Sequence, residues 1–467
     1  MANFFKAVVK PKTSKQLLTV SVDKLDMNGV GVARWQNKPL FIFGALPSEE
    51  VEVKVIEQKS KYSRAKLISI IKKSDKRIQP QCIHFGLCGG CDLQILDITE
   101  QLNFKQQKVS YLFSRCFSAE NIAKKIVQQD LPWQAPIKSS PWNYRRKARL
   151  GVQFDKKGQV TIGFRQKSTN QLAAIKSCAV LVEPLNKIFP LLKKIMAQLT
   201  VKSAIGHIEA IQADIIDSDS QGKIQKDNQI ILVIRQLRPM NKADIELWLS
   251  NAQQHFWHVI VDDGDKQFPL VPLQKDSSLV LSYELADKSK IYFASSDFIQ
   301  INHQVNNAMI SQALTWLNLS STDKVLDLFC GLGNFSLALA KQVQIVTGVE
   351  GVQVMVDKAS KNAEFNIIDN CQFYQADLNS DWLLESWATE HVFDKVLLDP
   401  ARAGAEQAVR QIAKLKISTV LYVSCDPATL ARDSAILIAQ GYKLDKMSLM
   451  DMFSQTKHVE TMVLFTQ

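Results

Sequence analysis

The chain has 467 residues, of which 46% are hydrophobic and 22% are charged, a composition typical of an ordinary globular protein. Its length exceeds what one hydrophobic core supports and predicts roughly two to four domains. No apolar run is long enough to cross a bilayer, and the first residues lack a secretory signal pattern, so we expect a cytoplasmic location.

The net charge of +11 is concentrated at one end of the chain. Residues 1–80 contain 16 Lys and Arg against 7 Asp and Glu, a difference of +9, which leaves +2 for the remainder. A basic end is either a solvated arm that aids solubility or a positively charged surface that attracts phosphates. We favour the phosphate-binding surface, because this segment has a folded pattern and is not low in complexity.

Apolar and polar residues alternate over short runs between residues 16 and 72, with a turn signal at Asn28-Gly29. Several short strands within 60 residues predict a small β-barrel of OB type in a domain that spans residues 1–75. Such barrels often bind oligonucleotides. The expected strands are Leu17 to Val22, Gly31 to Arg34, Pro39 to Phe43, Glu50 to Gln58 and Arg64 to Ile71.

Three of the eight cysteines cluster as Cys82-x5-Cys88-Gly-Gly-Cys91. A cytosolic chain keeps its thiols reduced, so a tight cluster indicates a metal or redox site. Cys178 is the best fourth candidate, because it lies in the same middle region, residues 76–285, which we expect to be a mixed α/β domain with a helix near residues 98–125. Four thiolates hold either zinc or a [4Fe–4S] cluster, and the spacing leaves that choice open.

Residues 286–467 alternate between apolar strands and helical patterns, which predicts a doubly wound, Rossmann-like α/β domain. Residues 217–227, upstream of it, read as a polar loop. The buried parallel strands expected in the α/β domain are Val325 to Phe329, Ile345 to Val349, Gln372 to Gln375, Lys395 to Leu398 and Thr419 to Val423.

The first of these strands is followed by Cys330-Gly-Leu-Gly-Asn-Phe-Ser336. Glycines at this point let the backbone turn tightly and approach a ligand. Ser336 stands where the dinucleotide fingerprint requires glycine, which argues against NAD, and no Gly-Lys-Ser/Thr phosphate-binding loop is present.

Acidic residues follow the next three strands, at Glu350, Asp377 and Asp399. Glu350 has the spacing of a carboxylate that accepts hydrogen bonds from ribose hydroxyls, and Asp377 is suited to read an adenine amino group. Each acid alone could be an ordinary strand-end cap. Together they resemble the Rossmann-like methyltransferases that bind S-adenosylmethionine.

Cys425 lies between the fifth strand and the helix that follows it, and Pro427 is suited to the first turn of that helix. A helix N-terminus favours a thiolate, so we expect Cys425 to be a nucleophile. Methylation at C5 of a pyrimidine uses such a thiolate at C6, together with a base for the C5 proton. His458 and Glu460, before a last strand at Thr461 to Phe465, are candidates, although a surface histidine and a strand-edge glutamate are ordinary alternatives.

Four motifs make the resemblance specific: residues 328–335, Leu398-Asp-Pro-Ala-Arg402, residues 423–432 and residues 458–465. Over essentially the whole chain, these resemble the RNA 5-methyluridine methyltransferases. The resemblance implies that Cys425 is the nucleophile and that Glu460 is the base. It further implies that S-adenosylmethionine is bound by Gln300, Phe329, Asn334, Glu350, Asp377 and Asp399.

The resemblance also decides for a [4Fe–4S] cluster on Cys82, Cys88, Cys91 and Cys178, and it implies that the N-terminal barrel is a TRAM domain. Members with both features act on 23S ribosomal RNA, which we therefore expect as the partner. The alternatives are a related enzyme that methylates a different rRNA or tRNA uridine, and an RNA-binding redox sensor without catalysis.

Overall fold

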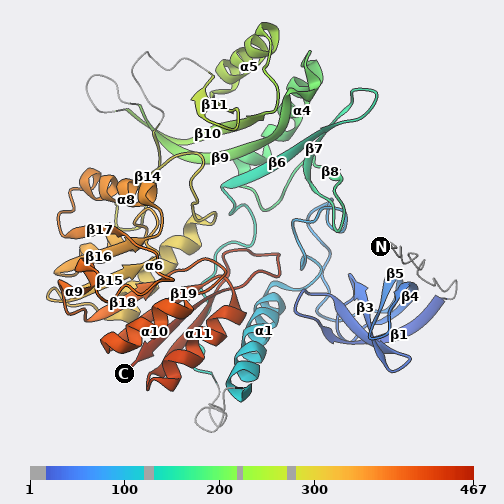
Figure 1. The fold of residues 1–467 in the computed structure, drawn as a ribbon. Helices are drawn as coiled ribbons and strands as arrows, with labels where there is room; N and C mark the ends of the chain where they lie inside the picture. The colour runs from blue at the N-terminus through green and yellow to red at the C-terminus, as the bar shows by residue number, and fades with distance from the viewer. Residues whose placement is uncertain (1–16, 120–130, 218–223, 271–279) are drawn as a thin grey trace, which may run out of the picture. The chain divides into compact units, whose positions relative to one another are not determined.

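The computed structural model describes residues 17–119, 131–217, 224–270 and 280–467 (Figure 1). By its internal contacts the chain divides into two compact units. One is Met1–Lys108 with Gln455–Lys457, and the other is Val109–Ser454 with His458–Gln467. The domain boundaries expected at residues 75 and 285 stay predictions.

The first unit begins with a closed five-stranded barrel in the order β1-β2-β3-β5-β4, which confirms the predicted barrel. Its core consists of small and branched apolar side chains, such as Leu40, Val53 and Ala65, that alternate with exposed residues along the strands. The strands are β1 (Leu17–Leu25), β2 (Gly31–Trp35), β3 (Lys38–Phe43), β4 (Glu50–Gln58) and β5 (Ser63–Lys72).

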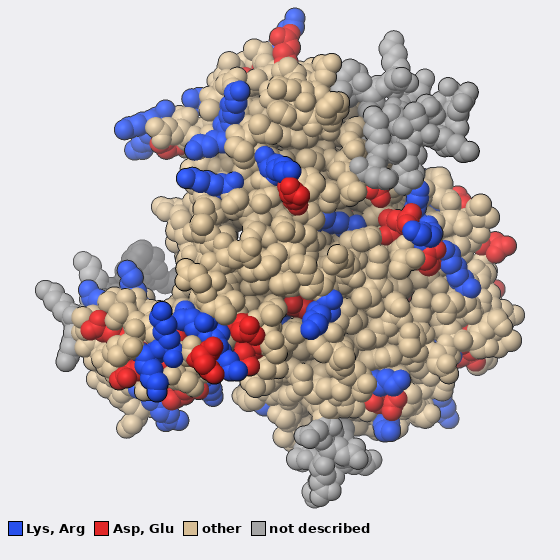
Figure 2. All heavy atoms as spheres, turned by 180° about the vertical axis from the view of Figure 1, so that it is seen from behind, with Lys and Arg blue, Asp and Glu red and all other residues tan. Residues whose placement is uncertain are grey.

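The outside of the barrel carries many exposed basic side chains, which include Lys54, Arg64 and Lys66. Figure 2 shows Lys and Arg gathered over the barrel, at the lower left of that view, with acidic side chains interspersed. The basic end of the chain is thus a folded surface.

A segment without helix or strand, residues 76–97, follows the barrel and carries Cys82, Cys88 and Cys91. It is anchored by Ile78 N–H, which donates to Ile95 O at 2.9 Å, and by Leu93 N–H, which donates to Gln455 O at 3.0 Å. The helix α1 (Ile98–Ala119) comes next and confirms the predicted helix as far as Ala119, and residues 120–125 of the prediction lie outside the described residues.

The second unit contains a central nine-stranded sheet. Its main path runs β12-β11-β10-β9-β6-β7-β8, and β13 pairs with both β9 and β14. The strands are β6 (Lys147–Phe154), β7 (Val160–Arg165), β8 (Leu172–Ala174), β9 (Ile205–Asp217), β10 (Ile224–Gln236), β11 (Trp257–Asp262), β12 (Gln267–Pro269), β13 (Val280–Glu284) and β14 (Lys290–Phe293). The helices are α3 (Glu183–Asn186), α4 (Ile188–Gln198) and α5 (Lys242–His255), with a 3₁₀ turn at Lys202–Ala204.

The polar loop predicted for residues 217–227 is wrong at both ends. β9 extends to Asp217 and β10 starts at Ile224, and the two strands pair in register at these residues. Ladder hydrogen bonds with a neighbouring strand therefore outweigh the low strand propensity of this polar stretch.

The second sheet of this unit has seven strands in the order β17-β16-β15-β18-β19-β21-β20, which confirms the predicted α/β fold. β15 to β19 are parallel, whereas β21 is antiparallel to β19 and β20, and β20 was not predicted. The strands are β15 (Lys324–Leu328), β16 (Ile345–Glu350), β17 (Cys371–Gln375), β18 (Lys395–Leu398), β19 (Thr419–Ser424), β20 (Lys443–Met450) and β21 (Glu460–Thr466).

Helices cover both faces of this sheet (Figure 1). Val305 and Met309 of α6 share one core with Val325, and Val409 of α10 shares the other with Leu326. The alternation of Val325 and Leu326 between the two cores is the period expected of a strand buried on both faces. The helices are α6 (His303–Leu317), α7 (Ser336–Ala340), α8 (Gln353–Phe365), α9 (Ser386–Thr389), α10 (Glu406–Leu415) and α11 (Pro427–Ala439).

A search of the described residues for a helix that is both long and apolar enough to cross a membrane finds none.

Candidate active site

The candidate site lies at the carboxyl ends of the parallel strands of the seven-stranded sheet. β15 lies between β16 and β18, so the strand order reverses between β15 and β18. Such a switch point is where open α/β sheets bind ligands. The loops after β15, β18 and β19 carry Phe329, Asp399 and Cys425 to this edge, and Glu350 ends β16 there.

The loop after β15 turns sharply through positive backbone angles. Phe329 has φ 63°, and Gly331 and Gly333 have φ 55° and 87°. The N–H of Phe329 donates to Val349 O at 2.8 Å, which fixes the loop to the next strand. A left-handed Phe is uncommon, so its place here reflects a loop that the surrounding contacts determine.

Glu350 links this loop to the end of β16. Its Oε2 accepts a hydrogen bond from Gly331 N–H at 3.2 Å, and its Oε1 accepts from Gly351 N–H at 2.8 Å. The predicted ribose contact is compatible with this position, since each carboxylate oxygen has a further lone pair. Asp377 is exposed, and its Oδ1 accepts from Asn379 N–H at 3.0 Å.

Asn334 and Gln300 are held by buried neighbours. The Asn334 amide exchanges two hydrogen bonds with Asn306, at 3.0 and 3.1 Å, and its Oδ1 also accepts from Tyr283 OH at 3.1 Å. The carbonyl of Gln300 accepts from Arg146 Nε at 3.0 Å. Both residues stay partly exposed, so their positions are fixed while part of their surface is available to a ligand.

Cys425 follows β19 directly and faces acidic neighbours. Burial is the largest cause that raises the pKa of its thiol, to about 11, and the charges of Glu460 and Asp399 raise it further, while Arg402 opposes them. Burial and the acidic neighbours therefore disfavour the thiolate in the free protein, against the stabilising effect expected from the helix N-terminus. Asp426 is the N-cap of α11, because its Oδ1 accepts hydrogen bonds from Ala428 N–H at 2.9 Å and Thr429 N–H at 3.2 Å.

The two candidate bases differ in their surroundings. Glu460 begins β21, and the register pairs the adjacent Thr461 with Ser424, one residue before Cys425. Glu460 is half-buried, and its charge acts on the Cys425 thiol, whereas His458 is exposed. The structure therefore favours Glu460 over His458 as the partner of the cysteine.

Asp399 and Asp327 are neighbouring acids beneath the site. Dense packing raises the pKa of each carboxyl to about 7, and for Asp327 the charges of Asp399 and Glu350 add to burial. Asp327 is 1% exposed, and Ser336 Oγ donates to its Oδ2. Sequence reasoning missed Asp327, although an acid inside an otherwise apolar strand was a visible signal.

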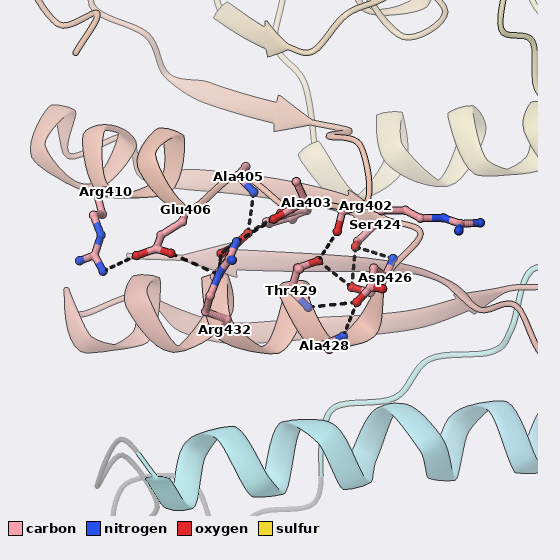
Figure 3. A network of polar contacts seen from close by, with 12 residues as sticks. Arg402, Ala403, Ala405, Glu406, Arg410, Ser424, Asp426, Ala428, Thr429 and Arg432 are labelled. Atoms are coloured by element: carbon pink, nitrogen blue, oxygen red, sulfur yellow. Dashed lines mark hydrogen bonds and ion pairs between the residues drawn. The ribbon is translucent and has the colours of Figure 1, made fainter. Parts of the chain in front are cut away.

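A second group missed from the sequence joins the loop after β18 to β19 and α11, and Figure 3 shows most of it. Asp433 Oδ2 accepts from Ala405 N–H and from Tyr422 OH, both at 2.7 Å. Arg432 donates through Nη2 to Ala403 O at 3.1 Å, and Thr429 Oγ1 donates to Arg402 O at 3.3 Å. The Arg402 side chain extends away from the other labelled residues, while its backbone is held by α11.

Cys82, Cys88 and Cys91 are half-buried cysteines of the first unit, and Cys178 is a half-buried cysteine of the second. Gly90 N–H donates to Cys88 Sγ at 3.4 Å, the type of contact that stabilises a ligating thiolate. Among the described residues, no three His, Cys, Asp or Glu side chains gather as a metal-binding group. The donor chemistry fits a cluster, and its assembly stays a prediction.

This fold and edge define an α/β methyltransferase, and comparisons with known proteins agree. The family model described as tRNA (Uracil-5-)-methyltransferase matches residues 118–467, and the TRAM domain model matches residues 11–68. The chain therefore belongs to the RNA uracil-5 methyltransferase family, whose members are S-adenosylmethionine-dependent enzymes.

Curated relatives cover the whole chain. The 23S rRNA (uracil(1939)-C(5))-methyltransferase RlmD of Colwellia psychrerythraea is 74% identical over 466 residues, which are 100% of this chain and 99% of the relative. The protein of the same name from Psychromonas ingrahamii is 44% identical over 470 residues, with 100% of both chains covered.

A solved structure shares the fold. The crystal structure of Pyrococcus abyssi tRNA (uracil-54, C5)-methyltransferase in complex with S-adenosyl-L-homocysteine matches with a TM-score of 0.69 at 20% identity. The match covers 96% of this chain and 100% of that chain. At this identity the likeness supports the arrangement of the strands and helices.

Proposed function

We propose that the chain methylates C5 of uracil 1939 in 23S ribosomal RNA. The observation that carries this proposal is the meeting of Cys425 with Glu460 and Asp399 at one edge of a methyltransferase sheet. The RNA is inferred from the TRAM match and from the full-length relatives that carry this activity in their names. Because that RNA belongs to the ribosome, we propose a cytoplasmic location.

In the proposed mechanism, the Cys425 thiolate adds to C6 of the uracil, and the electron pair displaced onto the ring makes C5 nucleophilic. S-adenosylmethionine supplies the methyl group that C5 takes. Glu460 then removes the C5 proton, and the electron pair of that C–H bond restores the double bond and expels the thiolate. The proton ends on Glu460 and the RNA leaves as 5-methyluridine.

The raised thiol pKa gives Cys425 a specific requirement. The thiol must lose its proton before attack, and two nearby carboxylates disfavour the thiolate. Burial raises the pKa of Asp399 to about 7, so near neutral pH a large fraction of this acid is protonated. A neutral Asp399 adds no negative charge beside the thiolate and can donate a hydrogen bond to a uracil oxygen.

We propose that S-adenosylmethionine, the methyl donor, is bound by Gln300, Phe329, Asn334, Glu350, Asp377 and Asp399. Five of these residues lie at or just after the ends of β15, β16, β17 and β18, and Gln300 comes just before α6. The fixed backbone of the loop after β15 adds support. The left-handed turn includes Gly331, which has no side chain and has no atom within 4 Å of where a Cβ would lie, so a ligand can approach the backbone closely there.

A test combines methyl-labelled S-adenosylmethionine with 23S rRNA from cells that lack the protein. We expect label at C5 of uracil 1939 and none with Cys425→Ala. Label at another uridine of rRNA or tRNA would favour a related C5 methyltransferase. Absence of label at every uridine would favour the RNA-binding redox sensor.

We also propose that Cys82, Cys88, Cys91 and Cys178 hold a [4Fe–4S] cluster, which when bound would order the surrounding RNA-binding surface. Protein purified without oxygen should contain about four irons per chain if the four thiolates ligate one cluster. Cys88→Ser should lose that iron, whereas Cys116→Ser, on the apolar face of α1, should keep it. Zinc in place of iron would contradict the proposal.

A further inference from the structure

A cavity of about 480 Å³ lies in the second unit, and none of its side chains has a chemical step in the proposed mechanism, although Tyr283 and Arg146 hold Asn334 and Gln300. It is bordered by the start of α6, the end of β13, the middle of β9 and the segment that leads into β6. The residues that line it include Arg146, Asp214, Ser282, Tyr283, Glu284 and His303.

Arg146 is 6% exposed and is fixed on three sides. Its Nε donates to Gln300 O at 3.0 Å, its Nη1 lies 3.4 Å from His303 Nδ1, and its guanidinium stacks 4.1 Å from the centre of the Tyr283 ring. Nη2 is buried and has no hydrogen-bond partner in the described structure. A buried charged donor without a partner is costly, so this edge is suited to an acceptor that the chain does not supply.

The polar groups His303 and Ser282, which also line the cavity, are uncharged, so Arg146 supplies its positive charge. A guanidinium can only donate, so His303 Nδ1 accepts and the imidazole is neutral. Burial, and then the charge of Arg146, lower the pKa of His303 to about 4. Ser282 is fully buried, and its Oγ is a second polar atom at this cavity that lacks a partner within the described residues.

The cavity also contains acceptors, which decide the class of ligand. Asp214 interacts electrostatically with Arg146, and Glu284 forms an ion pair with Lys288 at 2.8 Å. Two carboxylates at one cavity disfavour an anion such as a phosphate. They favour a neutral ligand with acceptors on one edge and donors on another.

Guanine has this combination. Its O6 and N7 accept from arginine, and its N1–H and N2 amino group donate to carboxylates. RNA-binding proteins commonly splay out single bases and read their edges in such sites. The cavity volume lies within the usual range of ligand pockets and suits one nucleoside.

We infer that this cavity binds an unstacked guanine of the RNA substrate, with Arg146 on its acceptor edge and Asp214 or Glu284 on its donor edge. The inference rests on the proposed function and deepens it, since it names a second base that the enzyme reads besides the target uracil.

The experiment uses the full-length protein and a 23S rRNA fragment that the wild type methylates. Each guanine near the target is replaced in turn by 7-deazaguanine, which lacks the N7 acceptor. We expect one replacement to raise KM for the fragment about tenfold with the wild type and to have little further effect with Arg146→Met. If 7-deazaguanine raises KM with the wild type but not with Arg146→Met, the two effects do not add, which indicates that Arg146 contacts that guanine directly.

Two further variants separate binding from folding. Ser282→Ala removes a hydroxyl that has no partner, so it should fold normally and still raise KM for the fragment severalfold. Arg145→Met removes the neighbouring arginine, which does not border the cavity, and should preserve the response to 7-deazaguanine. Failure of the wild type to methylate any RNA would refute the proposed function itself.

Other results would overturn the inference. Equal effects of every 7-deazaguanine replacement on wild type and Arg146→Met would give Arg146 a purely structural role. Weaker binding of S-adenosylhomocysteine, without weaker binding of methylthioadenosine, would assign Arg146 to the carboxylate of the cofactor product.

Discussion

The catalytic edge of the seven-stranded sheet and the cysteine segment, residues 76–97, are organised in different ways. At the catalytic edge, the reactive side chains lie at or next to the ends of strands, and internal hydrogen bonds such as those of Glu350 and Asp433 fix the surrounding backbone. The cysteine segment has no helix or strand, and its thiols are partly exposed.

This difference indicates where each region obtains its geometry. The sheet supplies the spacing of Cys425 and Glu460, because their strands pair in a fixed register. The cysteine segment packs Leu93, Ile95 and Leu96 into a small apolar cluster but has no helix or strand to position its thiols. A ligand that binds the thiols would therefore contribute directly to its stability. The catalytic edge should therefore respond to single substitutions even when no ligand is bound.

The largest effect is expected for Cys425→Ala. Without the sulfur no adduct forms at C6, so methyl transfer should fall by at least about 10³-fold. The covalent complex with 5-fluorouridine RNA, visible as a shifted band on a denaturing gel, should also disappear. Cys116→Ala should retain both signals, and an adduct that persists in Cys425→Ala would refute this nucleophile.

Glu460→Gln should have two opposite effects. Methyl transfer should fall by about 10²–10⁴-fold, because the C5 proton loses its acceptor, and the RNA adduct should accumulate. In the free enzyme, loss of the carboxylate should lower the pKa of Cys425, so iodoacetamide should alkylate this thiol faster at neutral pH.

Glu406→Gln is the matched control, because Glu406 pairs with Arg410 at 2.9 Å and is not among the groups that shift the Cys425 pKa. In the wild type, alkylation should accelerate as the pH rises toward 11. Slower alkylation in Glu460→Gln would contradict the proposed arrangement.

The order of these residues along the sheet could be predicted from the sequence. Buried apolar runs locate the strands, and parallel strands place their carboxyl ends at one edge, so Glu350, Asp399 and Cys425 fall together. The structure supports that grouping through the effect of Asp399 on the Cys425 pKa.

The rest depends on packing that no local pattern reveals. Asp433 lies inside α11 and becomes an anchor only because Ala405 and Tyr422 reach it from other elements. The raised pKa of Cys425 depends on burial and on Glu460, which lies 35 positions further along the chain. β20 escaped prediction because its mixed polar sequence is stabilised by pairing with β21.

Gly404→Ala should disturb the catalytic edge by an intermediate amount. Gly404 has φ 78°, and an added Cβ would lie 2.7 Å from Asp433 Oδ2 and 2.8 Å from Thr429 Cβ. The loop that carries Arg402 would have to move, so kcat should fall about tenfold. Gly441→Ala has a similar positive φ, and its added Cβ would make only an ordinary contact, with Gln467 Nε2 at 3.7 Å, so it should leave kcat unchanged.

The smallest effect concerns Asp327, whose pKa is raised to about 7 by burial and by the charges of Asp399 and Glu350, against 3.8 for an ordinary Asp. The folded chain therefore binds more protons than the unfolded chain between these values. This stabilising contribution is present at low pH and is lost as the pH rises from about 4 to 7.

Asn cannot titrate, so the melting temperature of Asp327→Asn should rise relative to the wild type over this range, by about 2–4 °C for each kcal/mol. Differential scanning calorimetry at pH 5 and pH 8 measures this change. A difference that is the same at both pH values would show that Asp327 is ionised throughout and that the catalytic edge tolerates its buried charge.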